Sequence, residues 1–152
     1  MSAALSLTVI DVCDPFGEVV APSWLFRAEA VHRQLRPGLP SDYGAKMRRV
    51  FAGGARMSVA ALGEQVAGLA VWRVFENTFE GIKFYVDDLV TDQAHRSSGI
   101  GKALLASLEA EARKHGADAL VLDSDTQRLQ AHRFYCREGF VITSFNFKKQ
   151  LV

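Results

Sequence analysis

The alternation of hydrophobic and polar positions predicts a regular succession of strands and helices in the first half of the chain. Residues 5–12 are β-branched and partly alternating, which predicts a strand. Residues 23–35 place apolar side chains three and four apart and predict a helix, and residues 41–51 predict a second helix. The apolar runs 55–63 and 65–75 predict a β-hairpin, because a short glycine-containing turn joins them.

The second half continues the pattern with three more strands and two helices. A strand is predicted at 83–90, a helix at 99–115, and a nearly continuous apolar strand at 117–123. This strand, helix and strand are expected to form a right-handed parallel crossover. A last helix is predicted at 126–137 and a last, alternating strand at 140–148. The order β-α-α-β-β-β-α-β-α-β predicts an α/β fold with a mixed sheet.

Composition is that of one globular domain over residues 1–152. The chain is 49% hydrophobic and 23% charged, with a net charge of +1, so it can bury a core. Cys13 and Cys136 form neither a disulfide framework nor a metal-ligand pattern, which predicts a reducing, cytoplasmic location and no metal. The first fifteen residues lack a basic start and no apolar run approaches membrane-spanning length, so neither export nor membrane insertion is expected.

A glycine pair marks the passage from the strand at 83–90 to the helix that follows it. Two nucleotide-binding patterns fail there: Leu104 stands where a dinucleotide fingerprint needs Gly or Ala, and Arg96 stands where a P-loop needs Gly. What remains is Gly99 and Gly101 at a helix start, where exposed backbone N–H groups attract anions such as phosphate. The alternative is a tight strand-to-helix turn without a ligand.

Two motifs together resemble the GCN5-related N-acetyltransferase (GNAT) family. Arg96, two residues, Gly99, one residue and Gly101 match the family's signature, and Tyr135 is followed by Gly139 and Phe140 as in the family's penultimate helix. The order of elements upstream agrees with the family's fold. The resemblance implies a GNAT-type domain that transfers an acetyl group from acetyl-CoA to an amine.

The resemblance also assigns donor-side residues. The family's turn binds the pyrophosphate of coenzyme A, and the strand before it pairs with the pantetheine arm. The matching positions are Leu89, Val90, Thr91, Arg96, Ser97, Ser98, Gly99, Ile100, Gly101 and Lys102. Tyr135 matches the family's proton donor, a phenol that stays protonated near neutral pH; packing of an aromatic ring is its alternative role. Arg128 stands where many members have an Asn that contacts pantetheine; Asp123, Ser124 or Gln127 are the candidate replacements.

An acceptor amine must lose a proton before it attacks, so a base is expected beside the strand at 83–90. The resemblance points to Asp87, acting through water, as that base. On a regular strand Tyr85, Asp87 and Leu89 share one face and Asp88 lies on the other, unless a bulge shifts the alternation. Tyr85 and Asp88 are candidate substrate contacts, and Asp88 has the alternative role of binding backbone or capping a turn.

Basic residues concentrate where the family builds its acceptor pocket. The segment 24–56 holds seven, namely Arg27, Arg33, Arg36, Lys46, Arg48, Arg49 and Arg56, against Glu29 and Asp42. We expect a small-molecule amine whose carboxylate or phosphonate is bound by one or two arginines, with Arg27 as a candidate; a solvated basic helix face is the alternative. Nucleic acid is not expected as a partner, because no aromatic residues interleave the cluster.

Three further readings stay open. A non-catalytic module that binds acyl-CoA and regulates a partner would share the fold, and a protein N-acetyltransferase would share the chemistry. The alternating Phe145 and Phe147 fit core packing, our default expectation, or a strand that a homodimer shares. The sequence does not name the acceptor amine or the acyl length.

Overall fold

A five-stranded sheet forms the centre of the larger part of the molecule. The structure is a computed structural model that describes residues 5–152, and the chain divides into one unit that ends at Val121 and a second, Leu122–Val152. The sheet has the order β1-β2-β3-β4-β5. Its strands are β1 (Leu7–Asp11), β2 (Arg56–Leu62), β3 (Gln65–Asn77), β4 (Gly81–Thr91) and β5 (Ala119–Leu122). The first four strands pair in antiparallel fashion, each with the next.

Helices connect the strands in the predicted order. They are α1 (Pro22–Leu35), α2 (Tyr43–Ala52), α3 (Ile100–Lys114) and, in the second unit, α4 (Leu129–Arg137), with a short 3-10 turn η1 (Gln93–His95) before α3. Asp42 caps α2 by accepting from the backbone N–H of Ala45 at 3.0 Å. Gly116, with φ of +66°, follows the end of α3. The predicted α/β class with a mixed sheet is confirmed, as are the helices and the hairpin.

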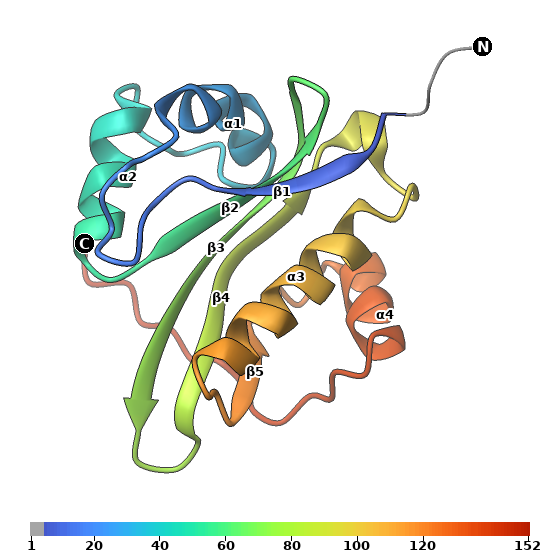
Figure 1. Cartoon of the computed structure of the whole chain (residues 1–152). Helices are drawn as coiled ribbons and strands as arrows, with labels where there is room; N and C mark the ends of the chain where they lie inside the picture. The colour runs from blue at the N-terminus through green and yellow to red at the C-terminus, as the bar shows by residue number, and fades with distance from the viewer. Residues whose placement is uncertain (1–4) are drawn as a thin grey trace. The chain divides into compact units, whose positions relative to one another are not determined.

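The helices of the first unit cover the two faces of the sheet separately, with α1 and α2 on one face and α3 on the other (Figure 1). On one face α1 and α2 pack on Val59, Leu69 and Val71. On the other, Ile100 and Leu104 of α3 pack on the small side chains of the sheet. Side chains of a strand point alternately to its two faces, so β2 and β3 each contribute side chains to the hydrophobic cores on both faces of the sheet. The site described below lies on the face that α1 and α2 cover.

Gly68 lets α3 lie close to the sheet. A Cβ atom at this position would stand 2.9 Å from the carbonyl oxygen of Val90 and 3.0 Å from side-chain carbons of both Ile100 and Leu104. The backbone oxygen of β4 cannot move away without disturbing strand pairing. The glycine therefore fixes the distance between the first turn of α3 and strands β3 and β4.

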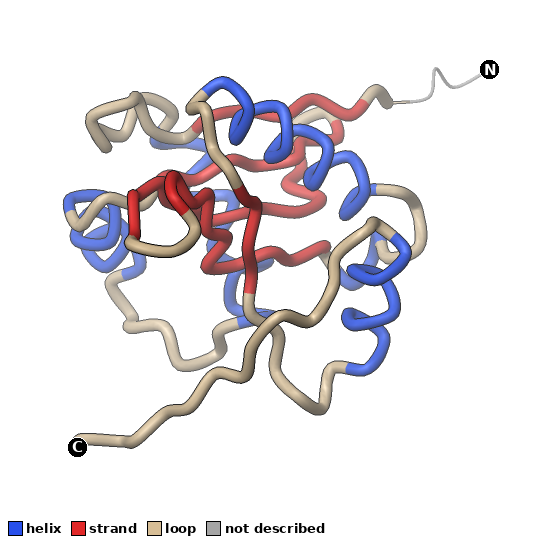
Figure 2. Tube along the Cα trace, turned by 90° about the horizontal axis from the view of Figure 1, so that it is seen from below, coloured by secondary structure: helices blue, strands red, loops and turns tan. Residues whose placement is uncertain are grey.

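The expectation of a final strand at 140–148 is wrong for this structure. The chain after α4 forms no strand, as the loop leading to the C-terminus in Figure 2 shows. Phe145 and Phe147 are 83% and 94% exposed, so the expectation that they pack in a core is also wrong. Alternation alone does not make a strand, because a strand needs a second backbone for its N–H and C=O groups. Within the second unit, the described residues form the helix α4 and no strand with which 140–148 could pair.

Among residues 5–152, no helix combines the length and apolar content that crossing a bilayer would require.

Replacing Gly68 with Ala tests the close approach of α3. Because the added methyl meets backbone and two packed side chains, we expect the free energy of unfolding in urea to fall by about 1–3 kcal/mol. Gly38→Ala is the matched control, since no atom lies within 4 Å of a Cβ at Gly38. Equal losses in the two variants would contradict this account of the packing.

Candidate active site

A bulge in β4 turns two neighbouring carboxylates to the same side of the sheet. Asp88 pairs with Val71 of β3 and Val86 pairs with Trp72, which leaves Asp87 as an extra residue. Asp87 and Asp88 both line one cavity, whereas Leu89 packs on the α3 side. A regular strand would have put Asp87 with Leu89 and away from Asp88. The expectation that Asp87 and Asp88 lie on opposite faces is therefore wrong. The bulge, which the sequence left open as the exception to regular alternation, is present.

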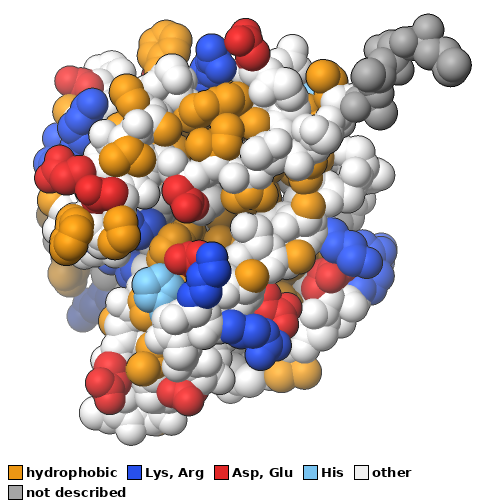
Figure 3. Space-filling model, in the orientation of Figure 1, with side chains coloured by type: hydrophobic (Ala, Val, Ile, Leu, Met, Phe, Trp, Pro, Cys, Tyr) orange, Lys and Arg blue, Asp and Glu red, His pale blue; other side chains and the backbone are white. Residues whose placement is uncertain are grey.

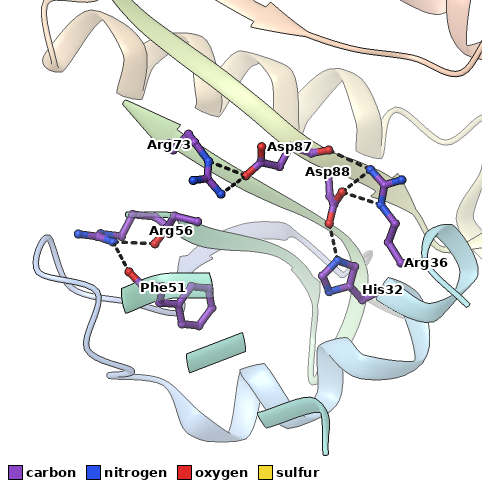
Figure 4. A network of polar contacts seen from close by, with 8 residues as sticks. His32, Arg36, Phe51, Arg56, Arg73, Asp87 and Asp88 are labelled. Carbon is purple, nitrogen blue, oxygen red and sulfur yellow. Dashed lines mark hydrogen bonds and ion pairs between the residues drawn. The ribbon is translucent and has the colours of Figure 1, made fainter. Parts of the chain in front are cut away.

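Asp88 is held by two residues of α1 (Figure 4). Its Oδ2 lies 2.7 Å from His32 Nε2, and its Oδ1 accepts from Arg36 Nε at 2.8 Å. Burial acts to raise the pKa of this carboxyl, but the hydrogen bonds and charges of His32 and Arg36 outweigh it and lower the pKa below its ordinary value. Asp88 is thus an ionised, 13% exposed carboxylate bound by side chains, rather than a turn cap.

His32 bridges Asp88 to a buried tyrosine. The ring is 1% exposed, and its Nδ1 lies 2.8 Å from the Tyr43 hydroxyl. Burial, followed by the charges of Glu29 and Asp88, raises the pKa of Tyr43, so the phenol keeps its proton. An ionised Asp88 accepts only, so Nε2 of His32 donates to it, and Nδ1 shares the second hydrogen bond of the ring with the Tyr43 hydroxyl. Every polar atom of this buried cluster is satisfied.

Asp87 is paired with a guanidinium of the neighbouring strand. Arg73 donates from Nε to Asp87 Oδ2 at 2.8 Å, and its Nη2 lies 2.7 Å from the same oxygen. Arg36 Nη2 donates to the backbone carbonyl of Asp87 at 3.1 Å. The bulge is therefore fixed from β3 by Arg73 and from α1 by Arg36. Within residues 5–152, Oδ1 of Asp87 has no partner, so one oxygen can receive a water or an amine.

An open cavity of about 660 Å³ lies over the bulge, between α1, α2, β3 and β4. Its charged lining is Asp87, Asp88, Arg36, Lys46 and Arg73, beside His32 and apolar side chains such as Met47 and Val71. Arg36 and Arg73 are paired with the two carboxylates, whereas Lys46 makes no ion pair in the part of the chain that the structure describes. The cavity thus offers carboxylates at its floor and a cation on its α2 wall.

The glycine turn presents bare backbone to solvent. Gly99 adopts a φ of +84° as the residue before α3, and no side chain caps the helix there. Ser97 is the non-glycine residue with positive φ among those described, at 64°. Arg96, Ser97, Ser98 and Lys102 are exposed, while Ile100 is buried beneath the turn. Exposed N–H groups, the helix dipole and nearby cations suit a pyrophosphate.

β5 leaves part of β4 without a strand neighbour on that side. Asp118 donates from its N–H to the Ile82 carbonyl at 2.7 Å, which places the start of β5 near the start of β4. The four residues of β5 can pair with only part of the eleven residues of β4. Leu89, Val90 and Thr91 pair with β3 at the far end of the strand, so their outer edge is suited to another extended chain such as pantetheine.

Tyr135 lies in the second unit, on α4. Its ring contacts those of Phe134 and Phe140, and burial raises the pKa of the phenol while the charge and hydrogen bond of Arg128 oppose that rise. The phenol therefore holds its proton at neutral pH, as a proton donor must. Arg128, which stands where an Asn was expected from the resemblance, contacts Tyr135.

Two candidate substrate residues lie outside the cavity lining. Tyr85 packs against Phe75 and Lys83, and Arg27 donates to the Glu64 carbonyl at 3.3 Å. The lining residues that sequence reasoning did not assign as site residues include His32, Lys46 and Arg73. For His32, the sequence offered one signal: it stands four residues before Arg36, so the two side chains lie on one face of the predicted helix. Among the described residues no group of three or more His, Cys, Asp or Glu side chains could hold a metal ion.

Comparison with known proteins identifies the class. The family model described as "Acetyltransferase (GNAT) family" matches residues 24–140. The chain therefore belongs to the GNAT family of acetyltransferases, and the resemblance inferred from the glycine turn and Tyr135 is confirmed.

Individual relatives match shorter stretches. Over 66 residues the chain is 42% identical to an aminoalkylphosphonate N-acetyltransferase of Salmonella typhimurium, a match that covers 43% of each protein. Over 71 residues it is 44% identical to the uncharacterized N-acetyltransferase YhdJ of Bacillus subtilis, covering 46% of this chain and 50% of that protein. The chain thus spans about half the length of the curated relatives it matches.

A solved structure extends the comparison to nearly the whole chain. An aminoglycoside N-acetyltransferase in complex with coenzyme A has a TM-score of 0.80 at 16% identity, covering 97% of this chain and 96% of that one. At this identity the likeness shows the shared fold.

Replacing Asp88 with Asn should destabilise the protein in a pH-dependent way. At pH 7 we expect a loss on the order of 1–3 kcal/mol in the free energy of unfolding, because charged hydrogen bonds to His32 and Arg36 are weakened. The pKa of Asp88 is lower folded than its ordinary value of 3.8. Its contribution is therefore complete well above that value and lost as pH falls through the folded pKa.

Urea titrations of wild type and Asp88→Asn from about pH 7 down to about pH 3 measure this difference. The gap in unfolding free energy should stay constant above about pH 5 and narrow below about pH 4. A gap that does not change with pH would contradict the assignment of an ionised Asp88.

Proposed function

We propose that this chain is an acetyl-CoA-dependent N-acetyltransferase that moves an acetyl group to the primary amine of a small molecule. The observation that carries the proposal is the cavity over the β4 bulge, with two carboxylates turned into it next to the strand end that leads to the glycine turn. Membership of the GNAT family supports the same chemistry.

The donor side is assigned to the turn and the end of β4. We infer that backbone N–H groups at Ser98–Lys102 bind the pyrophosphate, with Arg96 and Lys102 adding positive charge. Leu89, Val90 and Thr91 offer backbone to the pantetheine arm, and one N–H of β4 polarises the thioester carbonyl. Coenzyme A supplies the acetyl thioester that is attacked.

The acceptor side is assigned to the two acids. An alkyl ammonium, with a pKa of about 10 in water, must give up a proton before its nitrogen attacks. We infer that Asp87 takes this proton through a water molecule at its unpaired Oδ1. The new C–N bond forms, the C–S bond breaks, and the departing thiolate takes a proton from Tyr135, which solvent then replaces.

The cavity's charges favour an acceptor that carries an anionic group besides its amine. Carboxylates at Asp87 and Asp88 suit an ammonium, and Lys46 suits a carboxylate or phosphonate at the other wall. One relative is named for acetylating aminoalkylphosphonates. On the face drawn in Figure 3, acidic and basic side chains lie in small mixed groups, which does not resemble a single-sign field for a polyanion.

The first test is a thiol-release assay with acetyl-CoA across a panel of amines, run on wild type and Tyr135→Phe. Because the leaving thiolate needs a proton, we expect the variant to lose about a hundredfold or more in kcat with little change in KM for acetyl-CoA. Binding of acetyl-CoA without turnover of any amine, including peptide N-termini and lysine peptides, would favour the non-catalytic module. Turnover of peptides alone would favour a protein acetyltransferase.

The second test replaces Lys46 with Met, which keeps the length of the side chain and removes its charge. We expect KM to rise about tenfold for amines with a phosphonate or carboxylate and to change little for a neutral or diamine acceptor, because a charged hydrogen bond is lost. Arg48→Met is the control on the same helix, since Arg48 lines a separate hollow of about 190 Å³. Equal effects on all acceptors would exclude an anion contact at Lys46.

A further inference from the structure

We propose that His32 is a positioning residue which, together with Arg36, holds the Asp88 carboxylate in place as the group that binds the acceptor's ammonium. The inference rests on the proposed acetyltransferase function and adds the part of α1 that prepares the acceptor side. It divides the two acids of the bulge between two tasks, with Asp88 binding the amine and Asp87 serving its deprotonation.

The geometry gives each oxygen of Asp88 its own donor from α1. His32 Nε2 lies 2.7 Å from Oδ2, and Arg36 Nε donates to Oδ1 at 2.8 Å (Figure 4). The two residues are four apart in sequence, so they project from the same side of the helix. A carboxylate that accepts hydrogen bonds at both oxygens is fixed in its orientation toward the cavity. Arg36 Nη2 also lies 2.6 Å from Oδ1, so Oδ2, which has the single donor His32, keeps a lone pair for an ammonium in the cavity.

The burial of His32 makes a purely space-filling role a poor explanation. The ring is 1% exposed and needs the Tyr43 hydroxyl, 2.8 Å from Nδ1, as well as Asp88. An apolar side chain would fill this position without requiring two partners, and apolar replacements of buried ionic groups are often neutral or stabilising. Compared with an apolar side chain at this position, His32 gives the Asp88 carboxylate an additional hydrogen-bond donor.

Charged and titratable groups surround Asp88 on every packed element. They are His32 and Arg36 on α1, Tyr43 and Lys46 on α2, Arg73 on β3 and Asp87 on its own strand. Lys46 and Arg73 line the same cavity, but the hydrogen bonds to the Asp88 carboxylate come from His32 and Arg36 of α1. Removing the donor at His32 leaves a largely buried carboxylate with Arg36 alone, which favours its neutral form.

The test compares His32→Leu with His32→Gln. Leu removes the donor, whereas Gln carries an N–H at about the reach of Nε2. For His32→Leu we expect kcat/KM for the amine to fall about tenfold to a hundredfold, mainly through KM. In a plot of kcat/KM against pH, the loss of activity on the acid side, the acid limb, should begin at a higher pH in this variant, because Asp88 without the donor at His32 takes up a proton more readily. His32→Gln should restore most of the activity and the wild-type acid limb, and thermal unfolding checks that both variants fold.

Tyr43→Phe is the matched control, because it removes a hydrogen bond from the same buried cluster without touching Asp88. Its acid limb should stay at the wild-type pH. If His32→Leu, His32→Gln and Tyr43→Phe share one acid limb, His32 only packs the core and the proposal is overturned.

A readout without turnover separates this proposal from the proposed function. Carbon-13 NMR of the Asp88 carboxyl gives its pKa in the absence of any acceptor. We expect the pKa to rise in His32→Leu and to stay near the wild-type value in His32→Gln. If no amine is acetylated, the acetyltransferase proposal fails; an unchanged Asp88 pKa in His32→Leu overturns the positioning role whether or not the enzyme is active.

Discussion

One extra residue in β4 sets the direction of the two carboxylates on which the proposed acceptor site depends. Without the bulge between Val86 and Asp88, neighbouring side chains would point to opposite faces of the sheet. The irregularity is held from two sides, by Arg73 of β3 and Arg36 of α1. Because these contacts bind both a side chain and the backbone of Asp87, strand, helix and bulge support one another.

Donor and acceptor are proposed to be recognised by different kinds of groups. The glycine turn offers backbone N–H groups, whose presence depends on chain conformation and very little on side-chain identity. The cavity offers side chains of both charges from α1, α2, β3 and β4. A common donor with differing acceptors is therefore physically reasonable within one fold, since the cavity side chains can be exchanged while the turn is kept.

The sequence predicted elements well where local periodicity determines them, as in α1, α3 and the β2–β3 hairpin. It failed at 140–148, where alternation was present but strand pairing was not. The bulge at Asp87 depends on the register between two strands and leaves no local signal. His32 was overlooked because its partner Asp88 lies 56 residues away, so its burial and its hydrogen bond arise only after folding. The glycine turn was found because its residue types follow from its backbone conformation.

The bulge also means that the proposed acceptor site depends on how many residues β4 contains as well as on which they are. A deletion of one residue there would restore regular alternation and turn one acid toward the α3 side, with no change in the composition of the remaining strand. Two sequences that differ by one residue in β4 would thus turn different carboxylates into the cavity. Comparing such sequences by residue identity alone would align carboxylates that point in opposite directions.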